Sequence, residues 1–245
     1  MYKAIIMNKI INGIIAASML FAGYSCTKVD NYAGPNSTFQ GNIIDSVTGK
    51  NLQTEASGLQ IELKQLSWSD NPDPLFIPSN PDGTYSNTMV YSGHYSVLPT
   101  QGAFWPVDSI LKDISGATTQ NFTVVPYLEI VNLTHVQDAD SLVMTFQLQA
   151  PRTNGLPQII DATQFVNNTT LVGGGAFISQ FKDQSSSTVT FNSNWNSAIA
   201  ATTYRTVVHN LQPGWTYYAR VGVRVNDSYK QYNLSDIVQV VMAKK

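Results

Sequence analysis

Apolar and polar residues alternate in short runs along most of the chain after about residue 38. Leu59, Ile61 and Leu63 alternate with polar residues, and the segment 219–225 places Ala and Val at every second position. A period of two puts successive side chains on opposite faces of an extended strand, so each run predicts a strand with one buried face. No long stretch has the 3.6-residue period of an amphipathic helix. The pattern therefore predicts an all-β protein.

The predicted strands fall into two groups, which meet near Pro126. The first group covers 39–44, 59–64, 88–91, 94–98 and 122–130, with 108–114 as either a short strand or a helical turn. The second group covers 128–133, 142–149, 159–165, 177–181, 188–191, 204–209, 217–225 and 237–242. Many short strands separated by turn residues are typical of β-sandwiches. We expect two β-sandwich domains in tandem, at 38–127 and 128–245.

The N-terminal segment has a different pattern. Lys3 and Lys9 precede an apolar run at 10–22, which ends in Gly-Tyr-Ser and the single cysteine, Cys26. A bilayer core needs roughly 20 apolar residues, so this run fits a signal peptide better than a membrane span. Small residues before a cysteine predict a lipoprotein signal peptide at 1–26, with Cys26 acylated by fatty acids such as palmitate. The alternative is an ordinary secretory signal followed by a free thiol.

Residues 27–37 are polar, contain Gly-Pro and show no periodicity, so they predict a flexible tether between lipid and protein. Thr27 stands where an aspartate would favour retention at the inner membrane. The chain is therefore expected to be lipid-anchored in the outer membrane. We expect it to face the cell exterior, with the inner face of that membrane as the alternative. Asp30 is the only acidic residue of the tether, and acidic residues in this position favour surface export.

Charge and cysteine content exclude some functions. Charged residues make up 12% of the chain, the net charge is −2, and no basic run occurs. Nucleic acid is therefore not an expected partner. With one cysteine there is no disulfide within the chain, so the fold depends on its apolar cores.

The segment Leu211–Arg224 resembles the E–F corner of a fibronectin type III domain. It contains Leu-Gln-Pro-Gly-Trp-Thr-Tyr followed by strand alternation. The resemblance implies that the hydroxyl of Tyr217 bonds back to the chain and fixes the corner.

The first half of the chain resembles the transthyretin-like, or carboxypeptidase-regulatory-like, sandwich. The resemblance rests on GNIIDSVTGKNL at 41–52, DGTYSN at 82–87 and SGHYSVLP at 92–99. Together with the signal peptide and the fibronectin-like half, this combination resembles Bacteroidetes lipoproteins encoded beside SusC-like transporters and SusD-like lipoproteins in polysaccharide-utilisation loci. The resemblance implies these two proteins as partners and implies no catalytic residues.

Residues typical of catalytic and metal sites are scattered. His94, His135 and His209 have no second ligand at metal spacing, and Gly173-Gly174-Gly175 lacks the Lys-Ser/Thr of a phosphate-binding loop. Asp70, Asp73 and Asp82 share one loop, but its prolines do not fit a calcium loop. We expect no metal, no cofactor and no enzyme activity, although paired carboxylates of a glycoside hydrolase could still meet in space.

Aromatic residues in the predicted loops form the best candidate site. Sugars present C–H faces that stack on flat rings, while Asn, Gln and Asp bond the hydroxyl groups. The candidates for binding a poly- or oligosaccharide are Trp68, Tyr85, Phe104, Trp105 and Trp195. The alternative is that these rings cap the sandwich cores, as Trp and Tyr at loop bases commonly do.

Three Asp-Ser-apolar triplets resemble the O-glycosylation signal that Bacteroidetes use on exported proteins. Their serines are Ser46, Ser109 and Ser141. The alternative is that Asp-Ser pairs only favour turns.

The sequence thus predicts a non-catalytic envelope lipoprotein that assists glycan capture or uptake by a SusC/SusD-like transporter. A structural subunit of that complex, with no ligand of its own, is the alternative.

Overall fold

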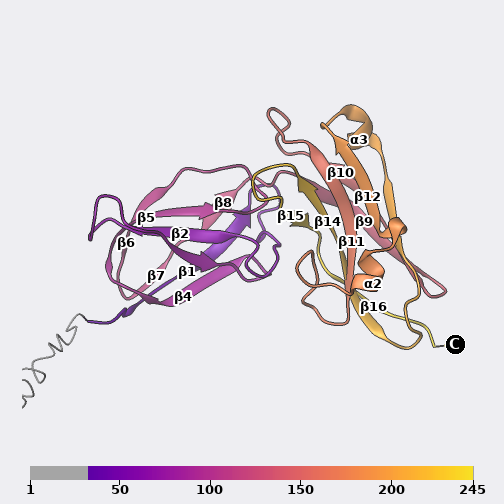
Figure 1. Ribbon diagram of the computed structural model, residues 1–245, viewed down its shortest axis with the longest axis horizontal. Coiled ribbons are helices and arrows are strands. Elements are labelled where there is room, and N and C mark those ends of the chain that lie inside the picture. Colours follow the sequence, from indigo (N-terminus) through magenta and orange to yellow (C-terminus); the bar gives the residue numbers. More distant parts are fainter. Residues whose placement is uncertain (1–32, 245) are drawn as a thin grey trace, which may run out of the picture. The chain divides into compact units, whose positions relative to one another are not determined.

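The computed structural model describes residues 33–244, which form two β-sandwiches in succession (Figure 1). Pro35–Lys245 is one compact unit. The predicted all-β class with two tandem sandwiches is confirmed. The signal peptide, Cys26 and most of the predicted tether lie outside the described residues. No helix within 33–244 is long and apolar enough to cross a membrane.

The N-terminal sandwich is built from two sheets. In the first, β1 is central and pairs antiparallel with β4 and parallel with β7 and β8. The second has the order β3-β2-β5-β6 and is antiparallel throughout. The strands are β1 (Ser37–Asp45), β2 (Gln60–Gln65), β3 (Leu75–Pro78), β4 (Thr84–Val90), β5 (Gly93–Thr100), β6 (Ile110–Ile114), β7 (Ala117–Thr119) and β8 (Phe122–Val124).

The apolar residues that alternate in the sequence are the ones buried between the two sheets. In β1, Phe39 and Ile43 are fully buried between partly exposed neighbours, and Ile61 and Leu63 of β2 repeat the pattern from the facing sheet. Burying one such side chain contributes about 1.5–3 kcal/mol relative to leaving it in water. This core therefore positions the ends of the strands, where the loops begin.

The C-terminal sandwich follows the same principle. One sheet has the order β13-β10-β9, and the other β12-β11-β14-β15, with β16 also paired to β14. The strands are β9 (Glu129–Asp138), β10 (Ser141–Gln149), β11 (Ile159–Asn167), β12 (Thr188–Ser193), β13 (Tyr204–Val208), β14 (Thr216–Val225), β15 (Tyr232–Leu234) and β16 (Val238–Val241).

The turn before β14 has the bond that the sequence predicts. Tyr217 is buried, and its hydroxyl accepts the backbone N–H of Gln212 at 3.2 Å. Along β14, Ala219, Val221 and Val223 are fully buried in the C-terminal core.

Two predictions of local structure are wrong. The segment 177–181, predicted as a strand, contains the helix α2 (Ser179–Lys182). Ile178 and Phe181 are three residues apart, so a helical turn directs both at the C-terminal core, whereas a strand would place them on opposite faces. The proline-rich loop contains an unpredicted strand, β3, whose only buried residue is Ile77. A further short helix, α3 (Ser197–Ala201), precedes β13.

Candidate functional site

Trp68 is the most exposed large apolar residue of those predicted to bind sugar. The residue is 68% exposed and borders an open hollow of about 450 Å³. We call this hollow the Trp68 pocket. It is lined by Gln65, Trp68, Ser69, Asn71, Pro72 and Asp73. One large ring beside amide, hydroxyl and carboxylate groups is an arrangement that can stack a sugar face and bond its hydroxyls.

The residues around the end of β2 fix the position of Trp68. After Gln65 the chain turns, and the Trp68 N–H donates to the Gln65 carbonyl at 3.3 Å. Gly93, which starts β5, lies against this turn, because a Cβ at that position would come within 2.5 Å of the Ser67 hydroxyl oxygen. A larger residue at 93 would displace the Ser67 and Gln65 side chains.

Tyr91 completes the aromatic surface, and sequence reasoning did not identify it. Its ring centroid lies 5.9 Å from that of Trp68, with the ring planes 39° apart. Tyr91 is itself held in place, since its carbonyl accepts the hydroxyl of the buried Tyr95 at 2.8 Å. The signal in the sequence was its position directly before the Ser92-Gly93 turn. The two rings are tilted, so they do not form a flat platform.

Tyr85 and Phe104 do not belong to this surface. They are 1% and 4% exposed and lie in the N-terminal core, so neither ring offers an open face on which a sugar could stack. The Tyr85 hydroxyl donates to the Gln120 carbonyl at 2.6 Å, and burial raises the pKa of this phenol. The prediction that these two residues bind glycan is therefore wrong, and they cap the core instead.

Trp105 and Trp195 also pack against a core and do not line the Trp68 pocket. Both are partly buried against the C-terminal core. The Trp105 ring lies 5.3 Å from that of Tyr127, and the guanidinium of Arg152 stands 4.3 Å from its centroid. Its outer face is thus occupied by a cation–π contact. The structure does not bring either tryptophan into the Trp68 pocket.

The three candidate O-glycosylation serines differ in exposure. Ser46 and Ser109 are exposed, while Ser141 is 8% exposed. The Ser141 hydroxyl bonds the Asp140 carboxylate at 3.1 Å and lies 2.8 Å from Nδ1 of His209. The Ser141 hydroxyl therefore has a structural role, and of the three serines only Ser46 and Ser109 are accessible to a bulky sugar.

The Gly-Gly-Gly segment receives a carboxylate instead of a phosphate. The Gly174 N–H donates to Glu55 Oε1, and Glu55 also interacts electrostatically with the buried Arg220. Burial raises the pKa of Glu55 and lowers that of Arg220 to about 10. A Cβ at Gly174 would lie 2.5 Å from that same oxygen, so a glycine is required there. We interpret the segment as a structural contact.

Glu129 is a partly buried carboxyl group that interacts with Asp45. Desolvation raises the pKa of Glu129 to about 7, and the adjacent Asp45 adds to the shift through its charge and a hydrogen bond. Glycoside hydrolysis requires two carboxyl groups placed far enough apart to leave room for the reaction. Burial is the main cause of the shift at Glu129 and the charge of Asp45 adds to it, so we assign this pair no catalytic role.

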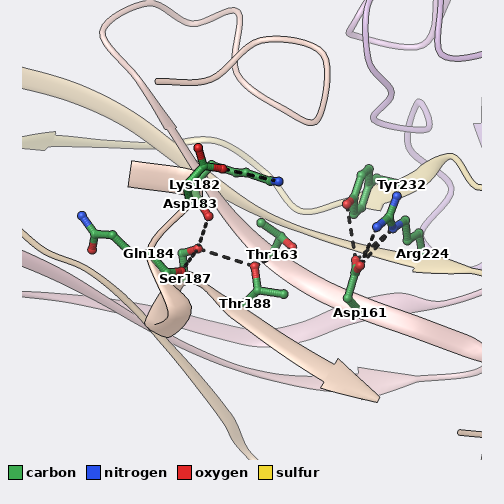
Figure 2. A network of polar contacts seen from close by, with 9 residues as sticks. All are labelled: Asp161, Thr163, Lys182, Asp183, Gln184, Ser187, Thr188, Arg224 and Tyr232. Atoms are coloured by element: carbon green, nitrogen blue, oxygen red, sulfur yellow. Dashed lines mark hydrogen bonds and ion pairs between the residues drawn. The ribbon is translucent and has the colours of Figure 1, made fainter. Parts of the chain in front are cut away.

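A third polar cluster lies on the C-terminal sandwich. Figure 2 shows Arg224 and Tyr232 converging on Asp161. Arg224 Nη2 donates to Asp161 Oδ2 at 2.6 Å, and the Tyr232 hydroxyl donates to Oδ1 at 3.3 Å. Burial and the Asp161 charge raise the pKa of Tyr232 to about 12. All three groups are paired with one another, which is typical of a structural network.

Within residues 33–244, no group of three or more His, Cys, Asp or Glu side chains could hold a metal ion. His94 lies 2.7 Å from Asp113 through Nδ1, and both are exposed. The Trp68 pocket therefore remains the best candidate for ligand binding in this part of the chain.

Comparison with solved structures identifies the same two-domain fold elsewhere. A "putative carbohydrate binding protein" from Bacteroides uniformis superposes with a TM-score of 0.71 at 20% identity, covering 85% of this chain and all of that one. A DUF3823 family protein from the same species gives 0.73 at 21%, and one from Parabacteroides merdae gives 0.65 at 19%, with the same coverage. At these identities the similarity shows the fold alone.

No curated protein matches the sequence. Two family models do match, described as "Protein of unknown function (DUF3823) N-terminal domain" over residues 37–125 and "Domain of unknown function (DUF3823_C)" over 128–239. Between them they span nearly all of both sandwiches, and the chain belongs to the DUF3823 family.

Proposed function

We propose that this chain is a lipid-anchored, non-catalytic protein of the cell envelope that binds glycan at the Trp68 pocket. The observation that carries the proposal is the 68% exposed ring of Trp68 beside a hollow lined by Gln65, Asn71 and Asp73. An exposed indole offers a large apolar face at low entropic cost, and the neighbouring polar groups can orient a sugar. The description of the Bacteroides uniformis relative as a "putative carbohydrate binding protein" points in the same direction.

The anchor and the partners complete the proposal. Cys26 would hold the protein on the outer membrane, facing the exterior, and the protein would assist glycan capture by a SusC-like transporter with its SusD-like lipoprotein. The position of the pocket supports this arrangement. Asn36, at the end of the tether, accepts a hydrogen bond from Ser92 at 3.1 Å, and Ser92 directly follows Tyr91. Asn36 therefore lies beside the turn that follows Tyr91.

A structural subunit without its own ligand is the second candidate. It is favoured by the packing of Trp105 and Trp195 against the C-terminal core, which removes them from any platform. In that case Trp68 would contact a protein partner.

The two candidates separate in one experiment. The mature chain is run in affinity gels containing a panel of polysaccharides, and each ligand found is measured by calorimetry. We expect Trp68→Ala to weaken binding at least tenfold, as loss of a central aromatic contact does. Trp215→Ala is the matched control, because Trp215 is 55% exposed in the C-terminal turn. No binding across the panel, together with stable co-purification with the transporter, would favour the structural subunit.

A further inference from the structure

The lining of the Trp68 pocket contains an acidic side chain and no basic one. Of its six lining residues, Asp73 is the only one with a charged side chain, and none is Lys, Arg or His. Asp70 belongs to the same loop. Any ligand in the pocket therefore meets a carboxylate and neutral amide and hydroxyl groups.

The two basic side chains closest in sequence to the pocket and to Tyr91, Lys64 and His94, each contact a carboxylate outside the pocket. Lys64 precedes Gln65 in β2, and its Nζ lies 3.2 Å from the carboxylate of Glu62. His94 follows Gly93 in β5 and lies 2.7 Å from Asp113. Recognition of carboxylate or sulfate groups usually employs Arg or Lys donors, often as a bidentate fork. The lining of the Trp68 pocket supplies no such donor.

An acidic sugar would therefore be disfavoured twice. Its carboxylate would lose hydration without gaining a cationic partner, and it would stand near the carboxylate of Asp73. For like charges about 4 Å apart in water, the repulsion corresponds to roughly a fivefold loss of affinity. An uncharged sugar has no carboxylate to dehydrate and is not repelled by Asp73. Its hydroxyl groups can donate hydrogen bonds to the Asp73 carboxylate.

We propose that the ligand of the Trp68 pocket is an uncharged oligosaccharide, and that Asp73 selects against uronic-acid and sulfated glycans. This inference rests on the proposed function, because it names the class of glycan bound at the same site. The role of Asp73 is specificity, because its carboxylate accepts hydrogen bonds from sugar hydroxyl groups and repels anions.

The test compares one glycan in two charge states. A neutral oligosaccharide that binds is oxidised at C6 to its uronic acid, and both forms are titrated by calorimetry in 20 mM and in 1 M NaCl. We expect the oxidised form to bind at least fivefold more weakly in low salt. The ratio of the two affinities should fall in 1 M NaCl, where the screening length is about 3 Å and the repulsion from Asp73 is largely screened.

Two variants show whether Asp73 sets that ratio. Asp73→Asn should bring the low-salt ratio towards one, whatever its effect on absolute affinity. Asp82→Asn should leave the ratio unchanged, because the Asp82 carboxylate is bonded within its own turn to the Thr84 hydroxyl at 2.7 Å and does not line the pocket. An unchanged ratio in Asp73→Asn would show that Asp73 does not discriminate against acidic glycans.

The outcomes distinguish this inference from the function on which it rests. If the oxidised form binds as tightly as the neutral form or more tightly, and Trp68→Ala abolishes both, glycan binding stands and the neutral class is overturned. If no neutral or acidic glycan binds at all, the proposed function fails and the inference fails with it.

Discussion

The hydroxyl oxygens of Ser37 and Ser92 lie 2.8 Å apart. Ser37 opens β1, and Ser92 stands between Tyr91 and β5, so the start of the N-terminal sandwich and the aromatic surface are neighbours. The backbone N–H of Asn36 adds a bond to the Val90 carbonyl at 3.2 Å. About ten residues separate Cys26 from this point, which at full extension span roughly 35 Å.

The anchor itself gives the first prediction. Cys26→Ala should move the protein from the membrane fraction to the soluble fraction, because under the proposed anchoring the acyl chains would supply the membrane affinity, at about 0.8 kcal/mol per buried methylene. Fractionation with labelling by a palmitate analogue measures this directly. A variant that stays in carbonate-washed membranes would show that something other than Cys26 holds the protein there.

The Glu55 contact predicts a sharp difference between adjacent glycines. Gly174→Ala should destabilise the protein by about 1–3 kcal/mol, since its Cβ would lie 2.5 Å from Glu55 Oε1 and 2.8 Å from the Tyr232 ring. Gly175→Ala is the control, because its Cβ would lie at an ordinary 3.4 Å from Glu55 Oε2. Urea denaturation measures both. Equal midpoints for the two variants would show that the Glu55 contact does not constrain the loop.

Glu129 predicts a dependence of stability on pH. Its folded-state pKa is raised from 4.5 to about 7, so the folded state favours the protonated form. The contribution of Glu129 to the free energy of unfolding is therefore fully present below about pH 4.5 and is lost as pH rises towards 7. With the shift discounted for partial exposure, we expect a loss of about 1–2 kcal/mol over that window.

Glu129→Gln should remove most of this pH dependence, because an amide can bond Asp45 without a charge. Glu62→Gln, which changes an acid of the surface pair with Lys64, should leave it in place. Urea denaturation at pH 4.5, 6 and 8 is the measurement. The same slope in Glu129→Gln as in the unmodified protein would assign the pH dependence to other groups.

Exposure separates the three Asp-Ser triplets. In native material we expect a glycan on Ser46 and Ser109 and none on Ser141, whose hydroxyl bonds Asp140 and lies 2.8 Å from His209. Peptide mass spectrometry reads all three sites. Glycan on Ser141 would require the local structure to open, and three unmodified serines would leave turn formation as the only role of these triplets.

The strands could be predicted because alternation is a local property. Ile61 and Leu63 of β2, or Val221 and Val223 of β14, sit two residues apart, and that spacing alone places them on one face. Tyr217 could be predicted for a similar reason, since its hydroxyl bonds a backbone group only five residues away. By contrast, β3 buries a single residue, Ile77, and therefore shows no alternation.

The role of each aromatic residue was decided by tertiary structure. Trp68 and Tyr85 stand on either side of the same proline-rich loop, yet one is 68% exposed and the other 1%. Tyr85 is buried because strands distant in sequence close over it, and the Gln120 carbonyl receives its hydroxyl. The sequence by itself determined the β class, the two sandwiches and most of their strands. Only the packing of distant segments decided which rings became core and which one borders a hollow, because burial depends on what covers a side chain and not on the residues beside it.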